Sequence, residues 1–312
     1  MEIQELYSRI CANIGKVIKG KEDVIGKAAL CVLCGGHILM EDVPGTGKTT
    51  LVKALAKTLG LSFARVQFTP DLLPSDLTGI HFFDQKTQDF VFKPGPVFTN
   101  LLLADEINRA TPRTQSSLLE CMEEKQVTID GETMKLDAPF LVAATQNPIE
   151  IQGTFPLPEA QLDRFFMRLS VGYPDGQAEK EMLSSFVQSS PLDTLEACVA
   201  KEELLAAQEE IRAVFLSEEI KDYLLAITNA TRENGRVRLG VSPRGTLAFM
   251  RAAQAKAAVS GRNYVVPEDV KEVAADVLAH RILCKAANHS QNAAAREVLE
   301  EILNAVPAPE MK

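Results

Sequence analysis

The feature that most restricts the fold of this chain is a glycine-rich turn, Val43-Pro44-Gly45-Thr46-Gly47-Lys48-Thr49, between two different hydrophobic patterns. The run before it, HILMED at 37–42, predicts a short strand. The helical spacing of apolar residues over 49–59 predicts a helix that stops at Gly60. Glycines allow the backbone amides of such a turn to face a phosphate, and the helix N-terminus adds positive potential. The turn therefore predicts a strand–turn–helix unit that binds phosphate.

Each position of this turn has a chemical reason. The side chain of Lys48 reaches the β- and γ-phosphates of a nucleotide, and the hydroxyl of Thr49 can ligate Mg²⁺. We expect the nucleotide to lie against Pro44, Gly45, Thr46, Gly47, Lys48, Thr49 and Thr50. The complete pattern has glycine where Asp42 stands, so seven of its eight positions match. The alternative is a glycine turn before an ordinary helix.

Three further runs predict strands of the same sheet, at 62–68, 101–104 and 140–145. The last two are almost wholly apolar, which is typical of strands buried on both faces of a parallel sheet. Thr111-Pro112 marks a helix start between them. This alternation predicts an α/β fold with a doubly wound parallel sheet. Two hairpins, at 80–92 and 127–136, interrupt the pattern and are expected to be additions to it.

The second part of the chain has a different texture. Helical patterns occupy 201–215, 217–232, 243–260 and 267–284, and the last two begin with proline. We therefore predict a core domain over 1–172, followed by a smaller all-helical domain over 173–312.

Polar residues follow two of the predicted strands. Asp105 and Glu106 end the run LLLADE, and ligands of open α/β sheets bind at that edge. Asp105 would hold Mg²⁺, and Glu106 would align or deprotonate an attacking water. Asn147 ends the next strand and could position the same water. Alone, Asp105 and Glu106 could be loop acids, and Asn147 could belong to an ordinary Asn-Pro turn.

Two arginines are candidates for phosphate contact. Arg244 lies in the first turn of a helix capped by Ser242, where a cation opposes the helix dipole by about 0.3–1 kcal/mol. A bound anion would remove that conflict; the alternative is a solvated arginine. Arg164 follows a short helix that starts near Pro158. Its alternative, favoured by the sequence alone, is a surface ion pair with Asp163 or Glu159.

In this order, the phosphate loop, Asp105-Glu106, Asn147, Arg164 and Arg244 resemble the AAA+ ATPases. The stretches HILMEDVPGTGKT, LLLADEINRATPRTQSSLLECMEEKQVTIDG, VAATQNPIEIQGTFPLPEAQLDRFFM and SPRGTL resemble the MoxR family in particular, over nearly the whole chain. In such proteins aspartate is a common variant at the position of Asp42.

The resemblance implies a role for each residue. Asn147 corresponds to sensor 1, Arg164 to a finger donated to a neighbouring subunit, and Arg244 to sensor 2. Val17, Ile18 and Gly20 correspond to the segment beside the adenine. The ranges 80–97 and 127–136 correspond to the helix-2 insert and the pre-sensor hairpin. The resemblance also implies ATP or ADP with Mg²⁺ as cofactors and a ring-shaped homo-oligomer, expected to be a hexamer. Its implied activity is chaperone-like maturation of protein complexes, often with von Willebrand factor A domain partners.

Composition limits the other partners. Lys and Arg total 33 against 42 Asp and Glu, a net charge of −9, so binding to nucleic acid is disfavoured. Six cysteines are too few for a disulfide scaffold. The spacing of Cys31 and Cys34 is that of a redox motif, but both lie in an apolar helical run, which favours a structural role. No run is long enough to span a membrane and no signal peptide is evident, so a cytoplasmic protein is expected.

The alternatives are a DNA-translocating ring ATPase, a metal-chelatase motor subunit and a nucleotide-gated scaffold that does not hydrolyse ATP. Binding to DNA that falls steeply with salt would favour the first, and Glu106 argues against the last.

Overall fold

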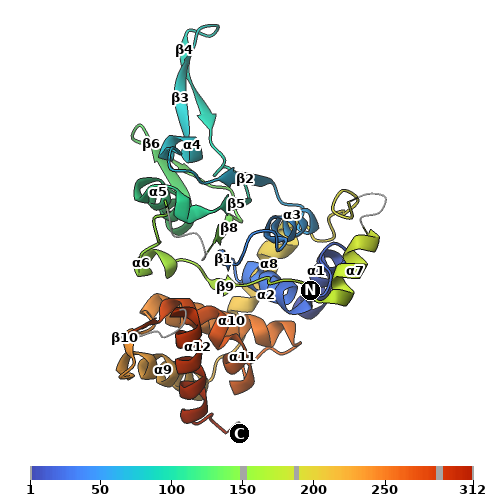
Figure 1. The fold of residues 1–312 in the computed structure, drawn as a ribbon, viewed down its shortest axis with the longest axis vertical. Helices are drawn as coiled ribbons and strands as arrows, with labels where there is room; N and C mark the ends of the chain where they lie inside the picture. The colour runs from blue at the N-terminus through green and yellow to red at the C-terminus, as the bar shows by residue number, and fades with distance from the viewer. Residues whose placement is uncertain (1, 148–152, 186–189, 286–290, 311–312) are drawn as a thin grey trace.

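A five-stranded sheet forms the centre of the first part of the chain (Figure 1). The computed structural model describes residues 2–147, 153–185, 190–285 and 291–310. The strands lie in the order β2-β5-β8-β1-β9, and every pair in the sheet is parallel. Their bounds are β1 Ile38–Glu41, β2 Phe63–Gln67, β5 Leu101–Asp105, β8 Leu141–Gln146 and β9 Met167–Leu169. The predicted doubly wound sheet is therefore confirmed, and β9 is an addition to it.

Alternate residues of these strands enter two different hydrophobic clusters. Ile38, Leu101 and Leu141 belong to the first, whereas their neighbours Leu39 and Leu102 belong to the second. Because side chains alternate across a strand, the two clusters cover opposite faces of the sheet. The helices of this part are α1 Ile3–Gly15, α2 Glu22–Leu33, α3 Lys48–Thr58, α4 Pro74–Thr78, α5 Pro112–Glu124 and α6 Glu159–Leu162, with a 3-10 turn η1 at Ile107–Arg109. Buried apolar residues of α1, α2 and α3 belong to the first cluster, and those of α5 belong to the second.

Both predicted hairpins are present. The first consists of β3 Gly79–Asp84 and β4 Asp89–Pro94, and the second of β6 Gln126–Ile129 and β7 Glu132–Lys135. Figure 1 shows the first hairpin projecting far from the body of the molecule. Its base needs Gly79, because φ is +99° there and a Cβ would lie 2.4 Å from the carbonyl oxygen of Lys93.

The second part of the chain is mostly helical, as predicted. Its helices are α7 Gly176–Ser185, α8 Lys201–Arg212, α9 Glu218–Glu233, α10 Pro243–Val259, α11 Pro267–Leu278 and α12 Gln291–Ala305. The predicted helix over 267–284 ends early, at Leu278. A 3-10 turn, η2 Ala279–Arg281, follows it, and β11 Leu283–Cys284 pairs antiparallel with β10 Val237–Leu239. These two short strands were not expected from the sequence.

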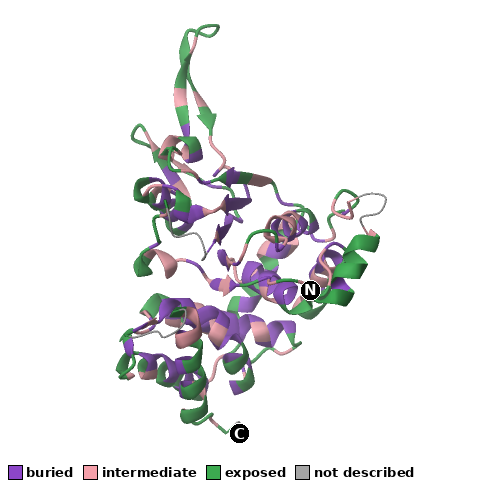
Figure 2. Ribbon diagram, in the orientation of Figure 1, coloured by how far each residue is buried: buried purple, intermediate pink, exposed green. Residues whose placement is uncertain are grey.

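The first hydrophobic cluster continues from the sheet into the helical part. It includes Ile10 of α1, Leu33 of α2, Phe249 of α10 and Val277 of α11. Helix α10 packs against both α2 and α11. Figure 2 shows that these helices are largely buried, with exposed residues on the outer helices. The boundary at 172/173 stays a prediction. In the part of the chain that the structure describes, every helix is too short or too polar to cross a bilayer.

Candidate functional site

The site lies at the carboxyl edge of the central sheet, where β1, β5 and β8 run side by side. Parallel strands end at the same edge, so the turn after β1, the acids after β5 and the asparagine after β8 meet there. They surround a cavity of about 410 Å³. Its lining consists of Pro44, Gly45, Gly47, Lys48, Thr49, Thr50, Arg65, Gln67, Asp105, Glu106, Thr145, Gln146 and Asn147. The structure thus brings most of the sequence-predicted residues to one place.

The glycine turn has the backbone conformation that anion binding needs. Gly45 and Gly47 have φ of +82° and +87°, and a Cβ at either position would meet nothing within 4 Å. The requirement for glycine is therefore conformational and not one of space. Helix α3 begins at Lys48, directly after Gly47, so the unpaired amides of its first turn open into the cavity.

Lys48 supplies the positive charge of this turn. Its Nζ donates hydrogen bonds to the carbonyl oxygens of Asp42 at 2.8 Å and Val43 at 3.1 Å. Burial lowers the pKa of Lys48, while the carboxylates of Asp42, Asp105 and Glu106 act to raise it. The ammonium group is thus held among acids and desolvated, which strengthens its attraction for a phosphate.

Asp42 stands where the complete motif has glycine, and the structure shows why an acid is tolerated. Positive φ occurs at Gly45 and Gly47 but not at Asp42. Its carboxylate accepts hydrogen bonds from the backbone N–H groups of Val43, at 2.8 Å, and Gly172. Asp42 therefore fastens the start of the turn to the segment that follows β9.

The two acids after β5 are held by different partners. Asp105 accepts from Thr145 Oγ1 at 2.6 Å and from the guanidinium of Arg65, whose closest approach is 2.6 Å. Glu106 Oε2 accepts from Gln67 Nε2 at 2.8 Å and Arg109 at 3.0 Å. Both carboxylates line the cavity and are directed by neighbours in adjacent strands or turns.

Glu106 also has an unusual backbone. Its φ is +55°, in the left-handed region that residues other than glycine seldom adopt. Its N–H donates to Thr145 Oγ1 at 2.8 Å. Backbone strain of this kind costs on the order of 1–3 kcal/mol. It is typical of functional sites, where the direction of a side chain is fixed at the expense of the stability of the protein.

The oxygen donors at this edge suit Mg²⁺. The Thr49 hydroxyl and the Asp105 carboxylate line the same cavity, and both are hard ligands. Among the described residues, no three His, Cys, Asp or Glu side chains are grouped to hold a metal ion by themselves. A magnesium ion here would therefore share its coordination with the phosphate oxygens of a ligand.

Asn147 directly follows β8 on the cavity wall and is 7 % exposed. The Asn-Pro turn that was its alternative includes Pro148, which lies outside the described residues. The amide is near the phosphate loop and the acids, so it is placed to orient a ligand or a water.

Arg164 and Arg244 do not line this cavity. Both contact the carboxylate of Glu123, at the end of α5: Arg164 Nε lies 2.8 Å from Oε2, and Arg244 Nη2 binds Oε1. The partner considered for Arg164 from the sequence, Asp163 or Glu159, is therefore wrong. Asp163 binds Arg281 instead, with Nε at 2.8 Å. The predicted cap of α10 is confirmed, since Ser242 Oγ accepts from the N–H of Gly245 at 3.0 Å.

The segment expected beside the adenine lies between α1 and α2. Val17 is buried and Ile18 is half-buried. Gly20 has φ of +65°, and a Cβ there would lie 2.4 Å from the Cβ of Ala178 in α7. None of the three lines the cavity at the sheet edge, so their contact with a nucleotide stays a prediction.

Sequence reasoning missed four residues that line the cavity, Arg65, Gln67, Thr145 and Gln146, and it missed Glu123, which binds Arg164 and Arg244. Arg65 and Gln67 alternate on β2, and the period of two would have placed both on the face of Asp105 once the β2–β5 pairing was known. Thr145 was inside a predicted strand. No pattern in the sequence around Glu123 indicates that it belongs to the site.

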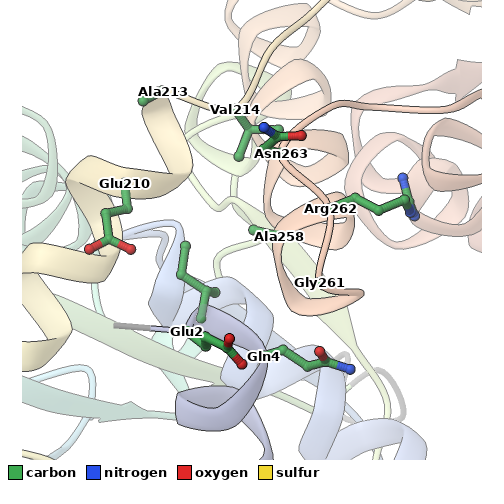
Figure 3. A pocket seen from close by; sticks show the side chains of 10 residues that line it. Glu2, Gln4, Glu210, Ala213, Val214, Ala258, Gly261, Arg262 and Asn263 are labelled. Carbon is green, nitrogen blue, oxygen red and sulfur yellow. The ribbon is translucent and has the colours of Figure 1, made fainter.

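A second cavity, of about 390 Å³, lies between the start of α1, the end of α8 and the end of α10 (Figure 3). Glu2 and Glu210 line it, and its glycine turn, at Gly261, follows the carboxyl end of α10 and does not precede the amino end of a helix. Arg262, the cation of its lining, is bound to Asp269 by two contacts of 2.6 Å. The chemistry for holding a phosphate therefore lies at the sheet edge and not here.

The cysteines carry no site. All six are free thiols, and burial raises the pKa of Cys31 well above its ordinary value. The prediction of a structural role for Cys31 and Cys34 agrees with these surroundings.

Comparison with known families agrees with this architecture. The model of the "ATPase family associated with various cellular activities (AAA)" matches residues 37–167, and that of the "AAA lid domain" matches residues 229–302. The crystal structure of a candidate ATPase from Cytophaga hutchinsonii superimposes with a TM-score of 0.88 at 42% identity, covering 99% of this chain and 98% of the other. The fold and the site thus define a member of the AAA class of P-loop ATPases, with a lid domain.

Comparison with individual relatives identifies the family within the AAA class to which the chain belongs. The chain is 47% identical to YeaC of Bacillus subtilis, over 99% of this chain and 96% of the relative. It is 38% identical to the protein named Chaperone MoxR1 of Mycobacterium tuberculosis (97% and 82%), and 30% identical to Protein MoxR of Methylorubrum extorquens (98% and 96%). The chain belongs to the MoxR family of AAA+ ATPases.

Proposed function

We propose that this chain hydrolyses Mg²⁺-ATP and couples turnover to the remodelling or maturation of a partner protein. The observation that supports this most is the convergence of Lys48, Thr49, Asp105, Glu106 and Asn147 on one cavity at the sheet edge. Phosphate binding alone would need only the glycine turn. The paired acids beside it are the additional chemistry that hydrolysis requires.

The binding role belongs to the glycine turn and Lys48. The amides at the start of α3 and the desolvated ammonium of Lys48 would hold the β- and γ-phosphates. Thr49 and Asp105 would hold Mg²⁺ together with phosphate oxygens. When bound, the ion neutralises charge on the phosphates and favours their displacement.

The catalytic role belongs to Glu106 and Asn147. Glu106 would orient the attacking water and accept its proton, and its carboxylate is already directed by Gln67 and Arg109. The amide of Asn147 would align the same water against the γ-phosphate. These two groups come from neighbouring strands, so their separation is set by the sheet and not by a loop.

Arg244 and Arg164 would complete the site. We propose that Arg244 contacts the phosphates in its own subunit and that Arg164 reaches the site of a neighbour. A finger donated in this way requires a head-to-tail interface, which closes into a ring when the rotation permits. A hexamer and a partner with a von Willebrand factor A domain are the assembly and the substrate class that family membership favours.

The decisive experiment compares phosphate release and ATP binding in the wild type and Glu106→Gln. The variant should bind ATP as tightly as the wild type and release phosphate at least about 100-fold more slowly, because a general base is worth roughly 10²–10⁴ in rate. Gln85→Glu, on the exposed tip of the first hairpin, is a control that changes charge in the reverse sense away from the site. Undiminished phosphate release by Glu106→Gln would refute the role of Glu106.

A further inference from the structure

One carboxylate, that of Glu123, binds both arginines that the proposed function places at phosphates. Arg164 occupies Oε2 at 2.8 Å and Arg244 occupies Oε1. The three residues come from different elements: Glu123 from the end of α5, Arg164 from the loop after α6, and Arg244 from the first turn of α10. A guanidinium that is paired with this carboxylate cannot at the same time neutralise a phosphate elsewhere.

The backbone around these arginines is held by other bonds. Asp163 accepts from Ser242 Oγ at 2.7 Å and from Arg281 Nε at 2.8 Å. Arg281, whose side chain is 2 % exposed, also donates to the carbonyl oxygen of Phe165 at 2.7 Å. The loop after α6 and the start of α10 are thus fastened together without Glu123. The ion pairs of Glu123 therefore position the side chains of Arg164 and Arg244. They are not needed to join the two parts of the chain.

We propose that Glu123 is a positioning residue that binds Arg164 and Arg244 and keeps both guanidinium groups away from phosphate until a nucleotide or a neighbouring subunit displaces it. Triphosphate in the chain's own cavity would compete with Glu123 for Arg244, and the site of a neighbouring subunit would compete for Arg164. The inference rests on the proposed function, because it takes the phosphate roles of the two arginines as given.

The exposure of the three side chains makes the competition reversible. Glu123 is 34 % exposed, Arg164 29 % and Arg244 44 %, so water screens both pairs. Pairs of this kind change an equilibrium by no more than about five-fold each. A polyphosphate that carries several charges can therefore displace the carboxylate, while the pair still sets a threshold for binding.

The first test measures the dissociation constant of Mg²⁺-AMP-PNP by calorimetric titration of the full chain. Glu123→Gln keeps the shape of the side chain and removes its charge, so it should tighten binding about three-fold. Arg244→Ala weakens binding, and in that background Glu123→Gln should have no further effect on the affinity. The matched control is Glu124→Gln, a change of the same charge at the next exposed residue of α5.

Three outcomes overturn the inference. Equal tightening by Glu123→Gln with and without Arg244 would show that the effect does not pass through this pair. The same tightening by Glu124→Gln would show a general effect of surface charge. An unchanged affinity would show that Glu123 does not compete. Failure of the wild type to bind the nucleotide is a separate result, which would refute the proposed function and the inference with it.

The second test addresses Arg164 through assembly, which does not depend on turnover. With Mg²⁺-AMP-PNP present, Glu123→Gln should shift the self-association midpoint in sedimentation velocity to a concentration about three-fold lower. The shift should vanish when Arg164→Ala is added. A shift that persists without Arg164, or no shift at all, contradicts the claim that Glu123 competes with the site of a neighbouring subunit for Arg164.

Discussion

His37 makes the stability of the sheet sensitive to acid. This residue precedes β1 and is 7 % exposed. Its Nδ1 accepts from the backbone N–H of Val142 at 2.9 Å, and its Nε2 lies 3.2 Å from the carbonyl oxygen of Met122. A neutral imidazole with its proton on Nε2 satisfies both contacts. Protonation of Nδ1 would place its N–H opposite the N–H of Val142, so that two donors would face each other. The native chain therefore requires the uncharged ring.

The magnitude follows from the pKa. Burial lowers the pKa of His37 from 6.5 to about 4, and the unfolded chain keeps the ordinary value. Between these two values the unfolded state binds more protons than the native state, so the free energy of unfolding falls as the pH falls. The slope is about 1.4 kcal/mol per pH unit, and the loss approaches about 3 kcal/mol near pH 4.

The assay is urea unfolding of the wild type and His37→Gln at half-unit steps from pH 7 to pH 4.5. Glutamine can accept and donate in the same directions but does not titrate. The variant should be less stable at pH 7 by about 1–3 kcal/mol if either contact is lost. Its dependence on pH should nevertheless be shallower by about 1.4 kcal/mol per unit below pH 6.5. Other titrating groups, including His280, whose pKa burial also lowers, are common to both proteins and cancel in the difference. Parallel curves would refute the argument.

Three further predictions test the site and its surroundings. Mixing Arg164→Ala and Lys48→Ala subunits should restore part of the phosphate release that each lacks alone, because one interface in the mixed ring then has both a working finger and a working cavity; absence of rescue in confirmed mixed assemblies would count against an arginine acting between subunits. Gln67→Leu removes the 2.8 Å hydrogen bond that directs Glu106 and should lower basal phosphate release about three-fold at an unchanged KM for ATP, as expected for loss of one modest hydrogen bond; a changed KM with an unchanged kcat would show that Gln67 acts on binding. Asp163→Asn leaves the buried Arg281 without its counter-charge and should lower the free energy of unfolding by about 3–5 kcal/mol in urea, whereas the exposed change Asp222→Asn should alter it by less than about 0.5 kcal/mol.

The parts of the fold and site that could be predicted are those with a local pattern. The turn before Lys48 needs glycine at particular φ values, and the strand before Asp105 is apolar at every position because both of its faces are covered. Edge β9 has only three residues, which is too short for any period to show. Strands β10 and β11 are similarly short and depend on each other for their hydrogen bonds.

Partners between distant segments could not be predicted. Arg164 and Glu123 are 41 residues apart, and Arg281 and Asp163 are 118 apart. A carboxylate on an exposed helical turn gives no sign of which guanidinium will reach it, since that depends on how the helical part packs on the sheet. The early end of α11 has the same cause, because Arg281 donates to the carbonyl oxygens of Phe165 and Phe166 from outside the helix.

The first hydrophobic cluster has a consequence for anyone who divides this chain. Since α10 and α11 share it with α1 and α2, a fragment that ends at residue 172 would leave apolar faces of the N-terminal helices bare. We expect such a truncation to aggregate or to be degraded rather than to fold as a lidless ATPase. Exchange of lids between relatives would likewise succeed only when the facing residues of α1 and α2 are transplanted with the lid.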